Sequence, residues 1–172
     1  MRLIGSVSIG RRRNRVQRVI YPINAVLAVK YLLTILLFVS GIVSADITGI
    51  AHVTDGDTVK INNTRIRLHG IDAPERNQKC EKYGQKWHCG KASTKLLRTL
   101  TTNKTITCKG SSTDRYKRLI AVCYVNGVDL NAAMVDAGLA LAYRKYSTQY
   151  VPNEKRAKRT NRGLWSGQFV NP

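Results

Sequence analysis

The stretch "RIRLHGIDAPER", Arg65–Arg76, decides the fold because it joins an alternating apolar run to a cluster of charged residues. Ile66 and Leu68 alternate with arginines, which is the period-two pattern of a half-buried β-strand. Asp72 and Glu75 follow, with a rigid proline between them. Such a stretch is either a surface turn with incidental ion pairs or a site that holds a cation and an anionic substrate together.

The flanking sequence predicts more short strands, because runs of β-branched and apolar residues recur between turn residues. These runs lie in residues 47–61, where "TDGD" interrupts them, and in residues 64–71, 104–110, 118–127 and 139–143. Asn62-Asn63 suits a tight hairpin turn, because Asn tolerates left-handed backbone conformations.

Helical segments are predicted in the second half of residues 82–102 and within residues 129–138 and 151–163. Leu96, Leu97 and Leu100 share one face of the first segment, and Asp129 or Asn131 is a suitable cap for the second. The predicted fold class is therefore α+β, mainly β with helices. A five-stranded OB-type β-barrel with about three α-helices fits this order, and the face of such a barrel commonly binds nucleic acids.

The first 45 residues differ from the rest of the chain. A basic segment precedes the apolar run Tyr31–Val43, and small residues follow at a possible cleavage point before Asp46. This order predicts a secretory signal peptide in residues 1–45 and one domain in residues 46–172. The alternative is an uncleaved membrane anchor, although a membrane-spanning helix needs about 20 apolar residues. We expect an exported protein, periplasmic or secreted, with membrane attachment only if residues 1–45 are retained.

The chain is strongly basic, with a formal net charge of +19. Residues 1–45 hold seven of the 29 Lys and Arg residues and none of the ten acids, so residues 46–172 still carry +12. This charge indicates a polyanionic partner, which could be nucleic acid, an anionic surface or an acidic polysaccharide.

All four cysteines lie after the predicted signal, and an even number in an exported chain favours disulfides. We expect the pairs Cys80–Cys89, at the two ends of one loop, and Cys108–Cys123, on two predicted strands. A zinc site formed by Cys80, His88 and Cys89 is the competing interpretation, but it lacks a second Cys pair with zinc-binding spacing.

Two short acidic motifs could bind a metal ion. "DGDT" supplies Asp55 and Asp57, which can point to one side of a strand, and "IDAPE" supplies Asp72 and Glu75. Hard cations such as Ca²⁺ prefer several oxygen ligands from carboxylates, carbonyls and water. Either motif alone also fits an ordinary turn, because Asp is frequent in turns.

Two arginines strengthen the functional interpretation. Arg67 lies on the strand that leads into "IDAPE", and Arg118 opens the strand that follows "TDRYK". The planar guanidinium group matches phosphate bidentately. In a chain this basic, a single arginine is most simply a solvated surface charge.

The motifs "TDGDTVKI", "IRLHGIDAPE", "EKYG", "TDRYKR", "GLALAY" and "GLW" together resemble the staphylococcal nuclease (thermonuclease) family, in content and spacing, from Ile47 to Trp165. The resemblance implies an OB-type barrel and a Ca²⁺-dependent nuclease, largely sequence-nonspecific, that cleaves DNA and RNA to 3′-phosphate products. We expect a monomer without an obligate protein partner.

The resemblance also implies roles for individual residues. Asp57, Asp72 and the backbone carbonyl of Ala73 would bind Ca²⁺, with Asp55 in its surroundings. The catalytic residues would be Arg67, Glu75 and Arg118. Tyr116 and Tyr143 would flank the bound nucleotide, where an aromatic ring can stack on a base.

The chain departs from the best-known family member at Ala73, which replaces Thr, at Lys117, which replaces Gly before the catalytic arginine, and at its four cysteines. The lysines at 79, 82, 86 and 91 and the run Lys155–Arg159 would add salt-sensitive affinity or simply be solvated. Two other functions remain possible from the sequence: a catalytically inactive nucleic-acid-binding OB module, and a binder of anionic surfaces that acts by charge alone.

Overall fold

The computed structural model describes residues 46–172, and the predicted signal or anchor in residues 1–45 lies outside them. Within the described residues, no helix is long and apolar enough to cross a membrane. These described residues make up the predicted domain.

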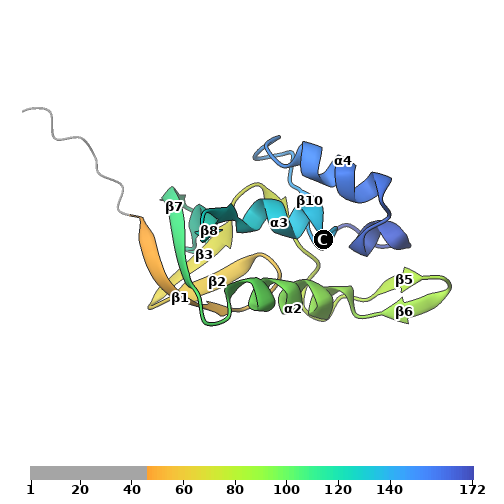
Figure 1. Ribbon diagram of the computed structural model, residues 1–172, viewed down its shortest axis with the longest axis horizontal. Helices are drawn as coiled ribbons and strands as arrows, with labels where there is room; N and C mark the ends of the chain where they lie inside the picture. Colours follow the sequence, from red (N-terminus) through yellow and green to blue (C-terminus); the bar gives the residue numbers. More distant parts are fainter. Residues whose placement is uncertain (1–45) are drawn as a thin grey trace, which may run out of the picture. The chain divides into compact units, whose positions relative to one another are not determined.

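Five strands of residues 46–172 close into a barrel (Figure 1). They are β1 (Ile47–Val53), β2 (Thr58–Ile61), β3 (Thr64–Leu68), β7 (Thr105–Thr113) and β8 (Leu119–Val125). The order β3-β2-β1-β7-β8 is antiparallel throughout, and a parallel pairing of β3 with β8 closes the ring. The prediction of a five-stranded OB-type barrel is confirmed.

The predicted turn chemistry explains how β2 reaches β3. Asn62 adopts φ +51°, the left-handed conformation that a two-residue hairpin needs, and the hairpin pairs Ile61 with Thr64. The inward residues of this hairpin, Ile61 and Ile66, are fully buried in the barrel core. The apolar alternation of the sequence is thus the alternation between the inside and the outside of the barrel.

Three α-helices of the described chain surround the barrel: α2 (Cys89–Thr101), α3 (Leu130–Asp136) and α4 (Val151–Arg159). α2 packs against β1, α3 against β8, and α4 against α3. Asp129 caps α3 as predicted, because its carboxylate accepts a hydrogen bond from the backbone N–H of Ala132. Short strands β4 (Ile71–Asp72), β9 (Val128–Asp129) and β10 (Leu141–Ala142) connect these parts.

Two segments differ from the sequence-based expectation. Residues 80–87 form a separate hairpin, β5 (Cys80–Lys82) and β6 (Gln85–Trp87), which projects beyond the N-terminal end of α2 (Figure 1). The last α-helix ends at Arg159 instead of reaching Gly163, and a 3₁₀ turn, Gly163–Ser166, follows it. The hydroxyl of Thr160 donates to the Arg156 carbonyl at 2.9 Å, which satisfies a carbonyl at the helix end.

The structure contains the two disulfides expected from the sequence, Cys80–Cys89 and Cys108–Cys123. Cys108 and Cys123 face each other across β7 and β8 in the buried core. Cys80 and Cys89 join the base of the β5–β6 hairpin to the start of α2. Since both sulfurs of this second pair are in a disulfide, they form no zinc-binding thiolate pair.

Candidate active site

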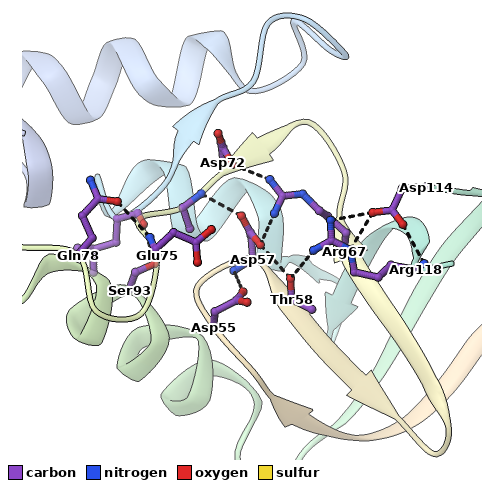
Figure 2. A network of polar contacts seen from close by, with 12 residues as sticks. Asp55, Asp57, Thr58, Arg67, Asp72, Glu75, Gln78, Ser93, Asp114 and Arg118 are labelled. Atoms are coloured by element: carbon purple, nitrogen blue, oxygen red, sulfur yellow. Dashed lines mark hydrogen bonds and ion pairs between the residues drawn. The ribbon is translucent and has the colours of Figure 1, made fainter. Parts of the chain in front are cut away.

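Asp57 directly precedes β2 and is the centre of a polar network (Figure 2). Its Oδ1 accepts hydrogen bonds from Arg67 at 2.6 Å and from the Thr58 hydroxyl at 3.0 Å. Its Oδ2 accepts from the backbone N–H of Ala73 at 3.0 Å, and the side chain is buried. The "DGDT" turn therefore holds one carboxylate inside the protein with several donors around it.

The turn sits close to α2 because Gly56 has no side chain. A Cβ at this position would lie 2.0 Å from the Ser93 hydroxyl oxygen and 2.7 Å from the Ala73 Cβ. Asp55 precedes the glycine, and its Oδ1 accepts from the Asp57 N–H at 3.1 Å. Asp55 thus supports the conformation of the turn.

Arg67 is positioned by the register of the barrel. β2 and β3 pair Thr58 with Arg67, so both side chains lie on the same face of the sheet. The guanidinium bridges two carboxylates, donating from Nη1 to Asp57 and from Nη2 to Asp72, each at 2.6 Å. One cationic group therefore brings two predicted metal ligands together from segments 15 residues apart in sequence, at residues 57 and 72.

Arg118 enters the same network from the turn before β8. Its Nη1 lies 3.3 Å from the Thr58 hydroxyl oxygen, and that hydroxyl in turn donates to Asp57. Asp114 holds the arginine through its Oδ2, which accepts from Nε at 2.8 Å and from Nη2 at 2.7 Å. The two predicted catalytic arginines thus reach one carboxylate, Arg67 directly and Arg118 through a single hydroxyl.

The turn that presents Arg118 tolerates Lys117. This residue adopts φ +61°, a conformation that favours glycine, the residue noted above for the best-known member of the family that the sequence resembles. Two hydrogen bonds nevertheless close the turn, from the N–H groups of Tyr116 and Arg118 to Asp114 Oδ1, at 2.9 and 3.0 Å. The departure at this position therefore leaves the arginine in the network.

Glu75 lies on the loop after β4, and Figure 2 shows its side chain directed toward Asp57. It is exposed, and within residues 46–172 no hydrogen bond or ion pair engages its carboxylate. The loop is held by Gln78, whose side-chain oxygen accepts from the Glu75 N–H at 3.2 Å. Gly90 lets the loop approach α2, because a Cβ there would lie 1.8 Å from the Glu75 carbonyl oxygen.

The two tyrosines expected near a nucleotide occupy different places. Tyr143 lines a cavity of about 590 Å³ that also includes Asp72, Lys145 and Lys158. Tyr116 is half exposed, and its ring centroid lies 5.4 Å from the Arg118 guanidinium. Tyr143 therefore lies on the side of the network that includes Asp72, and Tyr116 lies on the side that includes Arg118.

Burial and ion pairing shift the protonation of the central groups. Burial raises the pKa of Asp57 to about 7, although Arg67 and the hydrogen bonds from Ala73 and Thr58 act in the opposite direction. Burial opposes the charge on Arg67, but the carboxylates of Asp57 and Asp72 outweigh it and raise its pKa above the usual value. A further cation beside Asp57 would therefore lower the pKa of this carboxyl and favour its ionised form.

Sequence reasoning assigned no role to Thr58, Asp114 or Gln78. Thr58 links Arg118 to Asp57, Asp114 holds Arg118, and Gln78 holds the loop of Glu75. The turn at Asp114 could have been predicted from the sequence, because an Asp that opens "DRYKR" is typical of a turn in which the carboxylate accepts backbone N–H groups. The contacts of Thr58 and Gln78 depend on tertiary structure.

Comparison with known proteins agrees with this arrangement. The profile of the family described as staphylococcal nuclease homologue matches residues 65–167. An uncharacterized endonuclease of Escherichia coli O157:H7 is 37% identical over 146 residues, covering 80% of this chain and 90% of the relative. An uncharacterized endonuclease of Haemophilus influenzae is 33% identical, covering 80% and 79%. A micrococcal nuclease of Shigella flexneri is 32% identical, covering 77% and 81%.

The barrel, its network of paired arginines and carboxylates and these similarities define a phosphodiester-hydrolysing nuclease built on an OB-type fold. The resemblance noted from the sequence is confirmed over most of the domain. The chain belongs to the staphylococcal nuclease family.

Proposed function

We propose that this protein is a Ca²⁺-dependent endonuclease that hydrolyses DNA and RNA with little sequence preference and leaves 3′-phosphate ends. The observation that carries the proposal is the network in which Arg67 and Arg118 converge on Asp57, with Asp72 beside them. Two guanidinium groups can bind one phosphodiester and stabilise the negative charge that grows in its transition state.

The residues of the network fit a hard divalent cation. Asp57 and Asp72 lie within reach of one cationic group, and burial penalises the charge of Asp57. Within residues 46–172, no three His, Cys, Asp or Glu side chains form a metal cluster, so carbonyl and water oxygens would complete the coordination. Asp57, Asp72 and the Ala73 carbonyl would hold the ion. When bound, Ca²⁺ would act as a Lewis acid on a phosphate oxygen.

The protein's own residues perform the remaining tasks. Arg67 and Arg118 bind the phosphate oxygens, and Arg118 also stabilises the leaving oxygen. Glu75, whose carboxylate is exposed and faces the network, orients the attacking water or accepts its proton. Tyr116 and Tyr143 flank the bound nucleotide. Phosphate contacts carry no base information, so cleavage has little dependence on sequence.

A digestion assay tests the proposal. Plasmid DNA, single-stranded DNA and RNA are each incubated with the protein and Ca²⁺, and parallel samples contain EDTA. We expect Ca²⁺-dependent cleavage of all three and 3′-phosphate ends on the products. Binding without cleavage in Ca²⁺ would support the alternative, an inactive nucleic-acid-binding module.

We also propose that the enzyme acts outside the cytoplasm, after cleavage of residues 1–45. Two disulfides and a basic segment followed by an apolar run support this location. N-terminal sequencing of protein recovered from the extracytoplasmic fraction tests it, because an intact N-terminus would indicate a membrane-anchored nuclease instead.

A further inference from the structure

The β5–β6 hairpin, residues 80–87, belongs neither to the barrel nor to the polar network. It is nevertheless firmly attached. The Cys80–Cys89 disulfide joins its base to α2, and two backbone hydrogen bonds of 2.8 and 2.9 Å join Glu81 to Gln168. Gly167 permits this second attachment, because a Cβ there would lie 1.9 Å from the Glu81 carbonyl oxygen. The hairpin is thus a rigid projection.

The tip of this hairpin carries an unusual residue. Tyr83 adopts φ +52° and is 88% exposed. Six residues other than Gly have positive φ in the described chain, and four of them are Asn, the residue type that accepts this conformation readily. The turn between β8 and β9 has Asn126 before Gly127, whereas the hairpin tip has Tyr83 before Gly84. Neither backbone preference nor burial accounts for an aromatic ring at this tip.

The segment that carries Tyr83 is strongly basic. Residues 76–91 contain one acid, Glu81, and five exposed cations: Arg76, Lys79, Lys82, Lys86 and Lys91. Among the residues that the structure describes, none of these five takes part in an ion pair. The Lys82 ammonium lies 5.3 Å from the Tyr83 ring centroid. An exposed aromatic ring among unpaired cations is the combination that binds single-stranded nucleic acid.

We propose that the β5–β6 hairpin is a second binding site for the substrate and that it takes a single-stranded segment of DNA or RNA. An unpaired base stacks on Tyr83, and Lys79, Lys82 and Lys86 neutralise neighbouring phosphates. The proposal rests on the proposed nuclease function. Gln78 connects the two sites, because it holds the Glu75 loop and lies two residues before the hairpin.

The rigid attachment of the hairpin favours binding. A tip fixed by a disulfide and by the contact with Gln168 loses little conformational freedom when a strand docks on it. The lysines contact only phosphates, and Tyr83 can stack on the face of any base. We therefore expect the site to bind single strands of any sequence. A preference for single strands over duplex follows, because a paired base does not expose its face to Tyr83.

The substitution Tyr83→Asn tests the stacking contact. Asn removes the ring but suits φ +52° better than Tyr, so the hairpin should be preserved. Binding of fluorescein-labelled (dT)20 is measured by fluorescence anisotropy in EDTA. We expect affinity to fall about 5- to 150-fold, the range of one lost base stack, while Tyr83→Phe binds like the wild type. Affinity for a labelled 20-base-pair duplex should change less than twofold.

The charge contacts are tested with a triple variant, Lys79→Gln, Lys82→Gln and Lys86→Gln. The slope of log affinity against log salt concentration should become shallower by about 2, because each lost phosphate contact on a single strand contributes about 0.7. The matched control replaces three exposed lysines elsewhere, Lys60, Lys95 and Lys104, with Gln. It removes the same charge and should retain affinity within about threefold.

These measurements separate the two proposals. Binding in EDTA involves no cleavage, so a protein whose affinity depends on Tyr83 but which hydrolyses nothing would overturn only the nuclease function. The hairpin proposal is overturned if Tyr83→Asn binds (dT)20 within twofold of the wild type, if single strand and duplex lose affinity equally, or if the control triple variant loses as much as the hairpin variant. Thermal unfolding curves verify that each variant is folded.

Discussion

Arg67 and Arg118 are about equally buried, with side-chain exposures of 21% and 20%, but they are held in different ways. Arg67 lies between Asp57 and Asp72, which come from two other segments, so its position depends on the closed barrel. Arg118 is held by Asp114, four residues earlier in the same turn. One arginine is fixed by tertiary structure and the other by local structure.

The charge balance around the two arginines also differs. Arg67 faces two carboxylates, one of which is buried with its pKa raised to about 7. Arg118 faces one carboxylate, and although slight burial opposes ionisation of Asp114, hydrogen bonds from Arg118 and Tyr116 lower its pKa below the usual value. The two carboxylates around Arg67 carry one more negative charge than this arginine balances, so they favour a further cation. The single carboxylate at Arg118 is already balanced by its arginine. This difference can be tested in four ways.

The largest effect is expected from replacing each arginine with alanine. Both substitutions should lower kcat on single-stranded DNA by about 100-fold or more, because each removes a preorganised donor to the phosphate. Their effects on folding should differ. Arg67→Ala leaves the buried Asp57 without its cation and should lower the free energy of unfolding by about 3 kcal/mol.

Arg118→Ala leaves a partly buried Asp114 whose carboxylate still accepts the N–H groups of Tyr116 and residue 118, so it should cost under about 1 kcal/mol. Urea unfolding in EDTA measures both variants. The contrast between the two arginines is wrong if the variants unfold at the same urea concentration. The proposed catalytic roles are wrong if either folded variant keeps full turnover.

The second effect concerns pH. Because burial raises the pKa of Asp57 from 3.8 to about 7, the folded state binds more protons than the unfolded state between these two values. Stability of the metal-free protein should therefore fall as the pH rises from about 4 to 7, by a few kcal/mol at about 1.4 kcal/mol per pKa unit. Thermal unfolding in EDTA at several pH values measures this slope.

Asp57→Asn provides the comparison, since it removes the titrating group. Its overall stability should be lower, because one of the two oxygens that accept from Arg67 and Ala73 becomes an NH2 donor, but the slope should be smaller than in the wild type. Asp114→Asn should show the wild-type slope in this range. Equal slopes for the wild type and Asp57→Asn would show that the ionisation of Asp57 is not opposed by burial.

The third effect is stabilisation by Ca²⁺. At 100 times the dissociation constant, a ligand of the native state adds about 2.7 kcal/mol, which should raise the unfolding temperature. Arg67→Ala should respond to lower Ca²⁺ concentrations than the wild type, because the ion no longer shares Asp57 and Asp72 with a guanidinium. Asp57→Asn should lose the response. A similar response in all three proteins would place the ion elsewhere.

The same contrast between tertiary and local structure explains what the sequence could predict. The alternation of Ile66 and Leu68 and the turn at Asn62 are local patterns. Such patterns were sufficient to predict the strands of the barrel from the sequence. The residues of the site were predicted from a resemblance in motif content and spacing. The family match confirms the family, but it does not test the roles of these residues. The roles stay predictions until the variants are measured.

The β5–β6 hairpin could not be predicted in this way. Its strands have three residues each and are mostly polar, so they carry no alternating apolar pattern. They exist because the Cys80–Cys89 disulfide and the contact with Gln168, 87 positions from Glu81, hold them in place. Thr58 was overlooked for a similar reason, since its contact with Arg118 spans 60 residues.

The smallest effect is expected from Asp114→Asn, which tests whether a turn alone positions Arg118. Asn can still accept the N–H groups of Tyr116 and Arg118 through its oxygen, but it no longer pairs with the guanidinium. We expect kcat on single-stranded DNA to fall by about tenfold, because an arginine that samples several positions is seldom placed for the phosphate. KM should change less, since Arg67 still binds the substrate.

The matched control is Asp136→Asn, which breaks a comparable ion pair with Arg156 at 2.8 Å on the surface between α3 and α4. That variant should lose a little stability and no turnover, whereas Asp114→Asn should lose turnover and little stability. A drop in turnover for both would indicate a general effect of lost surface charge. Unchanged turnover in Asp114→Asn would mean that Thr58 and the barrel hold Arg118 as well as they hold Arg67, and the distinction between the two arginines would then disappear.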